Sequence, residues 1–215
     1  MITFLLGLFG YEDKKILNMI GTKNLFYLPY LLGYNIRLNR SFNSLPYGIY
    51  IFCGEQGSGK TLSLVRFAYV LKNHLKYDHF YSNMTLDGFQ LFNKLDSLTY
   101  VRKSIIVCDE MGIVQNSKSS KDVNADLLRF SAQNRKNQRI VLTSSQQVYM
   151  IQKDLRTQCR VLIDCAKVGP LVLNRYYKPI VDLDGNIDKS KLLKLDFFIA
   201  TKRLYNLYDT CEVIS

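Results

Sequence analysis

The chain has 215 residues, of which 47% are hydrophobic and 22% are charged. These values are typical of a folded globular protein, exclude a wholly disordered chain and allow one substantial core, so we expect a single main domain. Lysine and arginine together number 29 against 18 for aspartate and glutamate, and the net charge is +11. This excess favours a polyanionic partner, either nucleic acid or an anionic membrane surface. The alternative is that an AT-rich genome encodes many lysines.

The five cysteines fit neither a disulfide framework nor a zinc site, because their number is odd, no Cys-x-x-Cys pair occurs and the chain has only two histidines. We expect a reducing, cytoplasmic setting. The apolar run TFLLGLFG near the amino terminus is eight residues long, whereas a membrane-spanning helix needs about 20 apolar residues. No basic stretch precedes this run. We therefore expect neither a transmembrane segment nor a secretory signal.

Residues 1–46 are expected to form a basic and aromatic arm outside the main domain, which comprises residues 47–215. The arm carries scattered lysines and arginines among aromatic residues, with no clear helical or strand period. It either packs over its own domain or contacts a membrane surface or another subunit.

From residue 47 onward, the hydrophobic pattern predicts alternating strands and helices. Strands are expected at residues 47–54, 79–84, 104–110, 139–145 and 160–166, and helices after residue 61, over 89–94 and from Asp122 onward. This alternation predicts an α/β fold, a three-layer sandwich around a mostly parallel sheet. Residues 171–200 alternate in polarity around an Asp-Gly turn, which predicts an antiparallel extension of the sheet. A short helix is expected over 202–208.

The segment GEQGSGKT fits the phosphate-binding pattern Gly-x-x-x-x-Gly-Lys-Thr. Its glycines let the backbone curl so that N–H groups face an anion, and the next helix presents its positive end to the same place. Lys60 is expected to reach the β- and γ-phosphates, and the Thr61 hydroxyl to bind Mg²⁺. ATP and Mg²⁺ are therefore the expected cofactors. The expected cofactor site comprises Gly54, Glu55, Gln56, Gly57, Ser58, Gly59, Lys60 and Thr61.

A second magnesium ligand is expected from an aspartate at the end of a neighbouring apolar strand. The segment IIVCDE offers Asp109, and Glu110 directly after it can deprotonate the attacking water as a general base. Asp164 and the pair Asp182 and Asp184 also follow apolar runs. Neither place has a following glutamate, and so Asp109 is favoured.

Two segments fit the motifs of guanine-nucleotide switches, namely DEMG at 109–112 and NKLD at 93–96. Their order is the reverse of that in the switch proteins, where the guanine-reading motif follows the other. The order therefore disfavours a GTPase.

Gln146 follows the strand expected at 139–145. A polar side chain at the tip of the strand beside the Asp109 strand can contact both the γ-phosphate and the attacking water. We therefore predict that Gln146 senses hydrolysis, with a solvated strand end as the alternative.

These motifs resemble the HerA/FtsK superfamily of DNA-pumping ATPases, and within it the zonular occludens toxin (Zot) family, which includes the filamentous-phage assembly ATPase. The resemblance spans roughly residues 47–165 and depends on GEQGSGKT, FYSNMTL, IIVCDE, RKNQRIVLTSSQ and the ten-residue step from Gln146 to Arg156. Gln138 stands where the superfamily pattern has glycine. The Zot family often carries a membrane span and a periplasmic part, neither of which is visible here, so a packaging ATPase of a small virus is the alternative within the superfamily.

The resemblance implies a homo-oligomeric ring in which an arginine of one subunit completes the neighbouring site. Arg135 matches that family position, with Arg129, Arg139 and Arg156 as alternatives. Contact with DNA is expected from Lys118 and Lys121 in the polar loop QNSKSSKDV. Peripheral membrane or virion-assembly partners are also implied.

Two other functions compete with this interpretation. A small-molecule or nucleotide kinase with the same phosphate loop would need an acceptor pocket and an arginine-rich lid, and the sequence has no clear lid. A protein that binds the nucleotide without hydrolysing it would not need Glu110.

Overall fold

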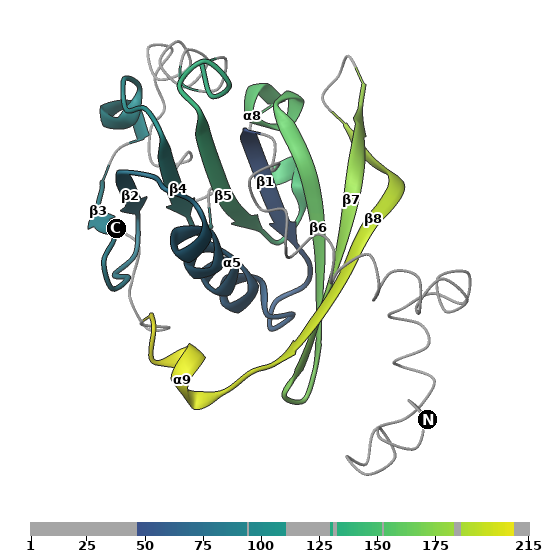
Figure 1. Cartoon of the computed structure of the whole chain (residues 1–215). Helices are drawn as coiled ribbons and strands as arrows, with labels where there is room; N and C mark the ends of the chain where they lie inside the picture. The colour runs from purple at the N-terminus through teal and green to yellow at the C-terminus, as the bar shows by residue number, and fades with distance from the viewer. Residues whose placement is uncertain are drawn as a thin grey trace.

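The computed structural model describes residues 47–93, 95–110, 130, 133–151, 153–182 and 186–208. Within these ranges, one eight-stranded sheet runs through the molecule in the order β3-β2-β4-β5-β1-β6-β7-β8 (Figure 1). The strands are β1 Gly48–Cys53, β2 His79–Ser82, β3 Gln90–Leu91, β4 Ser104–Cys108, β5 Arg139–Ser145, β6 Cys159–Val168, β7 Leu171–Val181 and β8 Ile187–Ile199. The helices are α5 Lys60–His74, α8 Lys153–Thr157 and α9 Lys202–Tyr205, with short 3₁₀ turns η2 Leu95–Leu98 and η3 Val148–Met150.

The sheet has a parallel part and an antiparallel part. All neighbours from β3 to β6 pair in parallel, whereas β7 pairs antiparallel with both β6 and β8. The last two strands are long and curve away from the parallel part (Figure 1). The expected α/β fold, with a mostly parallel sheet and a carboxyl-terminal antiparallel extension, is confirmed.

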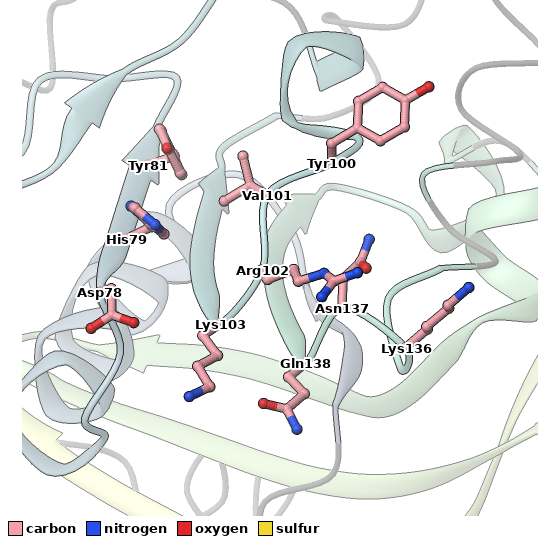
Figure 2. Close-up of a pocket in the computed structure, with 10 residues that line it drawn as sticks. All are labelled: Asp78, His79, Tyr81, Tyr100, Val101, Arg102, Lys103, Lys136, Asn137 and Gln138. Atoms are coloured by element: carbon pink, nitrogen blue, oxygen red, sulfur yellow. The ribbon is translucent and has the colours of Figure 1, made fainter.

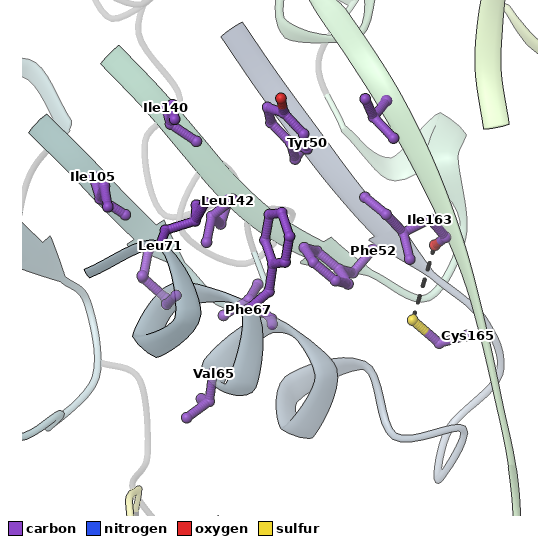
Figure 3. Packing of buried hydrophobic residues seen from close by; sticks show 14 of the residues in the cluster. Tyr50, Phe52, Val65, Phe67, Leu71, Ile105, Ile140, Leu142, Ile163 and Cys165 are labelled. Atoms are coloured by element: carbon purple, nitrogen blue, oxygen red, sulfur yellow. Dashed lines mark hydrogen bonds between the residues drawn. The ribbon is translucent and has the colours of Figure 1, made fainter. Parts of the chain in front are cut away.

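Helix α5 covers one face of the sheet. Phe67 lies at the centre of this contact, with its ring centroid 5.9 Å from that of Tyr50 on β1, 6.0 Å from Phe52 and 6.1 Å from Tyr176 on β7. Leu71 and other apolar side chains of the same helix face are buried against β4 and β5 (Figure 3). This helix therefore links the parallel strands to the antiparallel extension.

The opposite face is covered by short segments. Phe130, Ile151 and Leu155 are buried against the side chains that β1 and β4 present on that side, including Ile51 and Ile106. Because both faces are covered, β1, β4 and β5 are buried along their whole length and show no alternation of polar and apolar residues. The three layers predicted from the sequence are present.

The helix predicted over 89–94 is wrong. Gln90 and Leu91 form the edge strand β3, and the N–H of Phe92 donates to the carbonyl of Ser82 on β2 at 2.9 Å. A helix of six residues is only marginally stable by itself. Pairing with the edge of β2 and burial of Phe92 stabilise the strand conformation more than such a helix would be stabilised.

The other boundaries differ from the predicted ones by a few residues. The strands predicted at 79–84 and 104–110 end earlier, at Ser82 and Cys108, and the predicted final helix ends at Tyr205. Most of the helix predicted from Asp122 lies outside the described residues, as does the arm of residues 1–46. In the described part of the chain, no helix has the length and apolar character needed to cross a membrane.

Candidate nucleotide-binding site

The glycine-rich loop joins the end of β1 to the start of α5. Gly54 has a φ of 148°, and an added Cβ would lie 2.6 Å from both the Cys165 carbonyl oxygen and the Ser58 hydroxyl. Gly59, with a φ of 82°, is the N-cap of α5. L-residues rarely adopt these backbone conformations. The compact path of the loop therefore requires glycine at these two positions.

The amino terminus of α5 is open to an anion. Its N-cap makes no side-chain hydrogen bond, and its first turn contains no acidic residue. The Ser63 N–H bonds to the Gly59 carbonyl at 2.9 Å, whereas the N–H groups before it have no intrahelical partner, as in any helix. The buried Ser58 hydroxyl has no hydrogen-bond partner among the described residues. Unpaired donors beside a helix amino terminus fit a phosphate group.

Lys60 lies across the loop rather than pointing into solvent. Its side chain is buried, and Nζ donates to the Glu55 carbonyl oxygen at 2.9 Å. The ammonium group is thus held beside the loop that the sequence predicts will surround the phosphates.

Thr61 and Asp109 come together as predicted. The Thr61 hydroxyl donates to Oδ2 of Asp109 at 2.8 Å, and the Ser144 hydroxyl donates to the other carboxylate oxygen. Asp109 is buried at the end of β4. However, β4 is not the immediate neighbour of β1, because β5 lies between them. The contact forms because the carboxyl ends of parallel strands share one edge of the sheet.

Asn83 fixes the backbone at Asp109 through a reciprocal pair of hydrogen bonds. The Asp109 N–H donates to Oδ1 of Asn83 at 2.8 Å, and Nδ2 of Asn83 donates to the Asp109 carbonyl at 2.9 Å. Asn83 directly follows β2, the strand beside β4. Neither Asn83 nor Ser144 was among the site residues predicted from the sequence. The available signal was a polar residue at the carboxyl end of each strand flanking β4.

Glu110 lies two residues after the end of β4 and has a positive φ. Its φ is 48°, a left-handed conformation that is uncommon for a residue other than glycine, and its N–H donates to the Ser144 hydroxyl at 3.0 Å. Ser144 therefore contacts both acidic residues of the predicted site. Its hydroxyl donates to the Asp109 carboxylate and accepts from the Glu110 N–H. These two hydrogen bonds hold the end of β4 against β5.

The oxygen groups at this place fit Mg²⁺. Magnesium is usually held by one or two carboxylates together with substrate phosphates rather than by a cage of protein ligands. Thr61 supplies a hydroxyl and Asp109 a carboxylate. Within the described ranges, no cluster of three or more His, Cys, Asp or Glu side chains could hold a metal ion. An ion at this site would therefore depend on a bound nucleotide for its other ligands.

Gln146 follows β5, and β5 pairs with β4, as predicted. Gln146 is exposed and lines an open cleft of about 420 Å³ together with the first residues of the glycine-rich loop, Gly54, Glu55 and Gln56. The structure thus brings Gln146 to the edge of the sheet that carries the phosphate loop.

The rival aspartates have other partners. Asp164, within β6, forms ion pairs with Arg175 and Lys189, each with an N–O distance of 2.8 Å. Asp182 accepts a hydrogen bond from the Asn186 N–H at 2.7 Å, and Asp184 lies outside the described residues. Two cations already compensate the charge of Asp164, so Asp109 is the better metal ligand.

Of the arginines proposed to act on a neighbouring subunit, Arg139 is excluded. Its side chain is fully buried and its guanidinium bonds to backbone carbonyls. Arg135 is exposed in the turn before β5. This strand has seven residues and rises about 3.3 Å per residue, so Arg135 lies about 20 Å from the phosphate loop of its own subunit. Arg156 is half-buried. Three further predicted residues, Lys118, Lys121 and Arg129, lie outside the described residues.

A buried strand, a glycine-rich loop and a helix, with a hydroxyl and carboxylate pair beside the loop, define a P-loop NTPase fold. A crystal structure of the N-terminal domain of zonular occludens toxin from Neisseria meningitidis is similar to this chain, with 16% sequence identity, a TM-score of 0.50, and coverage of 77% of this chain and 100% of that domain. The predicted P-loop fold of the Zot kind is thus confirmed at the level of the fold.

Two further solved structures are similar over slightly less of the chain. The flagellar accessory protein FlaH from Methanocaldococcus jannaschii has 16% identity and a TM-score of 0.45, covering 72% of this chain and 86% of that chain. B204, the DNA-packaging ATPase from Sulfolobus Turreted Icosahedral Virus, has 16% identity and a TM-score of 0.44, covering 69% and 98%. No protein-family model and no curated protein sequence matches this chain.

Proposed function

We propose that this protein is a Mg²⁺-dependent ATPase that couples ATP hydrolysis to DNA movement, either extruding a viral genome during virion assembly or packaging it into a particle. The contact between the Thr61 hydroxyl and the Asp109 carboxylate carries the proposal. It joins the phosphate loop to the end of β4, where Glu110 follows. A phosphate loop without a carboxylate beside it would support nucleotide binding alone.

Each residue of the site has a role in this reaction. The loop N–H groups and Lys60 hold the β- and γ-phosphates, and Thr61 and Asp109 hold Mg²⁺, which neutralises phosphate charge when bound. Glu110 orients a water molecule and accepts its proton. Gln146 contacts the γ-phosphate and reports its loss to β5.

Arg135 of a neighbouring copy supplies positive charge to the transferring phosphoryl group. This role requires the ring, because Arg135 lies at the far end of β5 from the site of its own subunit. The net charge of +11 supports a polyanionic cargo. We place non-specific DNA contacts at Lys118 and Lys121.

The test measures phosphate release by the full-length chain with ATP and Mg²⁺, with and without DNA. Glu110→Gln is expected to lower kcat by about 10² to 10⁴ while a fluorescent ATP analogue still binds, because only the proton acceptor is lost. Asp87→Asn, which removes an exposed carboxylate elsewhere, is the control and retains activity.

Turnover by Glu110→Gln at the wild-type rate would contradict the assignment of the general base. Phosphate transfer that requires a small acceptor and ignores DNA would favour a kinase instead. If the wild-type chain binds ATP but does not hydrolyse it, the protein is a nucleotide-binding protein and not an ATPase.

A further inference from the structure

A second open site lies at the opposite edge of the sheet, where β2, β4 and β5 begin. It is a groove of about 790 Å³, within the size range of ligand sites of about 300–1,000 Å³. We call it the amino-edge groove and define it by Tyr81, Tyr100, Arg102, Lys103, Lys136 and Gln138 (Figure 2). It shares no residue with the phosphate loop.

The groove carries an excess of positive charge. Arg102, Lys103 and Lys136 line it against one carboxylate, that of Asp78. All three cations are exposed, and in the described part of the chain their side chains form no hydrogen bond or ion pair. Cations without internal partners are available to a polyanion, and contacts of this kind supply sequence-independent affinity for nucleic acid.

Aromatic faces accompany these cations. Tyr100 is 82% exposed, which is high for so large a side chain. Tyr81 lies on the other side of the groove and stacks on His79, with ring centroids 6.3 Å apart and an interplanar angle of 24°. An exposed aromatic ring beside basic residues, such as that of Tyr100, is the kind of platform on which proteins stack the bases of single strands. In a duplex the faces of the bases are stacked on one another, so they are not available to stack on a tyrosine ring.

Buried Arg139 holds the walls of the groove in place. Its Nη1 donates to the carbonyls of Leu98 at 2.8 Å and Thr99 at 3.0 Å, and Nη2 donates to the carbonyl of Phe130 at 2.6 Å. The guanidinium also lies over the Phe130 ring, 4.3 Å from its centroid. Tyr100 directly follows the bonded carbonyl of Thr99, and Arg102 lies two residues further on, so a fully buried cation fixes the start of the segment that presents them.

The two loops that line the groove are also bonded to each other. Nδ2 of Asn137 donates to the Thr99 carbonyl at 3.2 Å, and the Lys103 N–H donates to the Asn137 carbonyl at 2.9 Å. Lys103 and Gln138 have φ values of 46° and 55°, left-handed conformations that L-residues seldom keep unless the surroundings fix them. The groove is thus preorganised by its own backbone.

We infer that the amino-edge groove binds single-stranded nucleic acid. Arg102, Lys103 and Lys136 contact phosphates, and Tyr100 stacks on a base. Gln138, at the rim, bonds to a base edge or a sugar. This site is separate from the nucleotide site, and binding here requires no hydrolysis.

The test measures the binding of fluorescein-labelled oligothymidylate to the full chain, without ATP, by anisotropy over a range of salt concentrations. The double variant Arg102→Ala and Lys103→Ala is expected to bind at least about tenfold more weakly. Its slope of log affinity against log salt should fall by about 1.4, or about 0.7 for each of two lost phosphate contacts. Lys202→Ala with Arg203→Ala removes the same two charges from exposed positions on α9 and should leave both quantities nearly unchanged.

Tyr100 provides a second, charge-neutral test. Tyr100→Phe keeps the aromatic face and should bind as tightly as the wild type, whereas Tyr100→Leu should bind about tenfold more weakly because stacking on an aromatic ring contributes about 1 to 3 kcal/mol per base. Oligouridylate in place of oligothymidylate separates RNA from DNA, and tighter binding of either supports the inference.

An unchanged salt slope in the Arg102 and Lys103 variant, or equal binding by Tyr100→Leu and Tyr100→Phe, would overturn the inference. So would a preference for duplex DNA, or loss of self-association instead of oligonucleotide binding in the groove variants. Because the assay contains no ATP, its failure leaves the proposed hydrolysis unaffected. If Glu110→Gln did not reduce turnover, the inference that the groove binds single-stranded nucleic acid would likewise be unaffected.

Discussion

Three residues other than glycine have positive φ in the described part of the chain: Lys103, Glu110 and Gln138. Each lies where β4 or β5 begins or ends, and each is fixed by a backbone hydrogen bond to a neighbouring segment or turn. A left-handed conformation costs an L-residue about 1 kcal/mol. Both proposed sites therefore contain backbone that is less stable than an ordinary turn.

Substitutions at Gln138 test whether the left-handed backbone conformation or the side chain determines the contribution of this position to stability. Gln138→Gly should change the free energy of unfolding by no more than about 0.5 kcal/mol, because relief of strain is offset by the entropy of glycine in the unfolded chain. Gln138→Val should lower it by about 1 to 2 kcal/mol, because a β-branched residue is disfavoured at this φ. Urea unfolding measures both. Lys136→Val, in the same turn but without positive φ, should have little effect, and equal losses at the two positions would contradict the prediction.

Arg139 is expected to be the most important polar residue of the fold. Arg139→Met should lower the free energy of unfolding by about 3 kcal/mol or more, because it leaves buried carbonyls without donors. Arg135→Met, four residues earlier and exposed, should change it by less than about 0.5 kcal/mol. Similar denaturation midpoints for the two variants would show that Arg139 does not hold the loops.

At the scale of elements, Asp109 directly follows β4 and Asp164 lies within β6, and the two aspartates have different surroundings. Asp109 meets hydroxyl groups, whereas Asp164 meets Arg175 and Lys189. A carboxylate bonded to neutral hydroxyls can bind a divalent cation without first breaking an ion pair. The neighbours of each aspartate thus decide which of the two suits a metal.

Paired substitutions test this difference. Asp109→Asn should lower kcat for ATP hydrolysis by at least about a hundredfold, or about 2.7 kcal/mol of activation free energy, because a charged metal ligand is lost. Asp164→Asn should keep kcat within about threefold of the wild type and lower the free energy of unfolding by about 1 kcal/mol. Phosphate release and urea unfolding measure the two effects, and the reverse pattern of activities would assign the metal to Asp164.

The buried parallel strands and the phosphate loop were predictable, because β1 and β4 are largely apolar, β5 contains the apolar run Ile140–Leu142, and the glycine pattern lies between a strand and a helix. Strand β3 could not be predicted, because a strand of two residues has no hydrophobic periodicity and its conformation depends on pairing with the edge of β2. Asn83 and Ser144 were missed because many surface loops also have polar residues after a strand. Their roles depend on strand order, which places both beside Asp109.

At the scale of the whole molecule, the four cysteines among the described residues are distributed through the core. Cys53, Cys108, Cys159 and Cys165 are free and buried on β1, β4 and β6. Burial raises the pKa of Cys53 and of Cys159 to about 12 and raises the pKa of the other two thiols as well. The folded protein therefore keeps these thiols protonated at a pH where an unfolded chain ionises them.

Stability should consequently fall as the pH rises above about 8.5, where unfolded thiols begin to lose protons. The folded state then binds more protons than the unfolded state, so the stabilisation is complete below the unfolded pKa and is lost as the pH rises toward the folded pKa. Urea midpoints at about pH 7.5 and about pH 9.5, below the usual pKa of tyrosine, measure the fall. A Cys53→Ala variant should show a smaller decline, and an identical decline would exclude Cys53 as a contributor.

Strands β4 and β5 join the two ends of the molecule. Each begins beside the amino-edge groove and ends at the phosphate loop, and each has a hydrogen-bonded neighbour on both sides. An extended backbone, at about 3.3 Å per residue, has almost no length left to gain. Neither strand can slide alone without breaking its ladder. A pulling force on a nucleic-acid strand bound in the groove would thus be transmitted along β4 and β5 to Asp109 and Gln146, because these strands stretch very little.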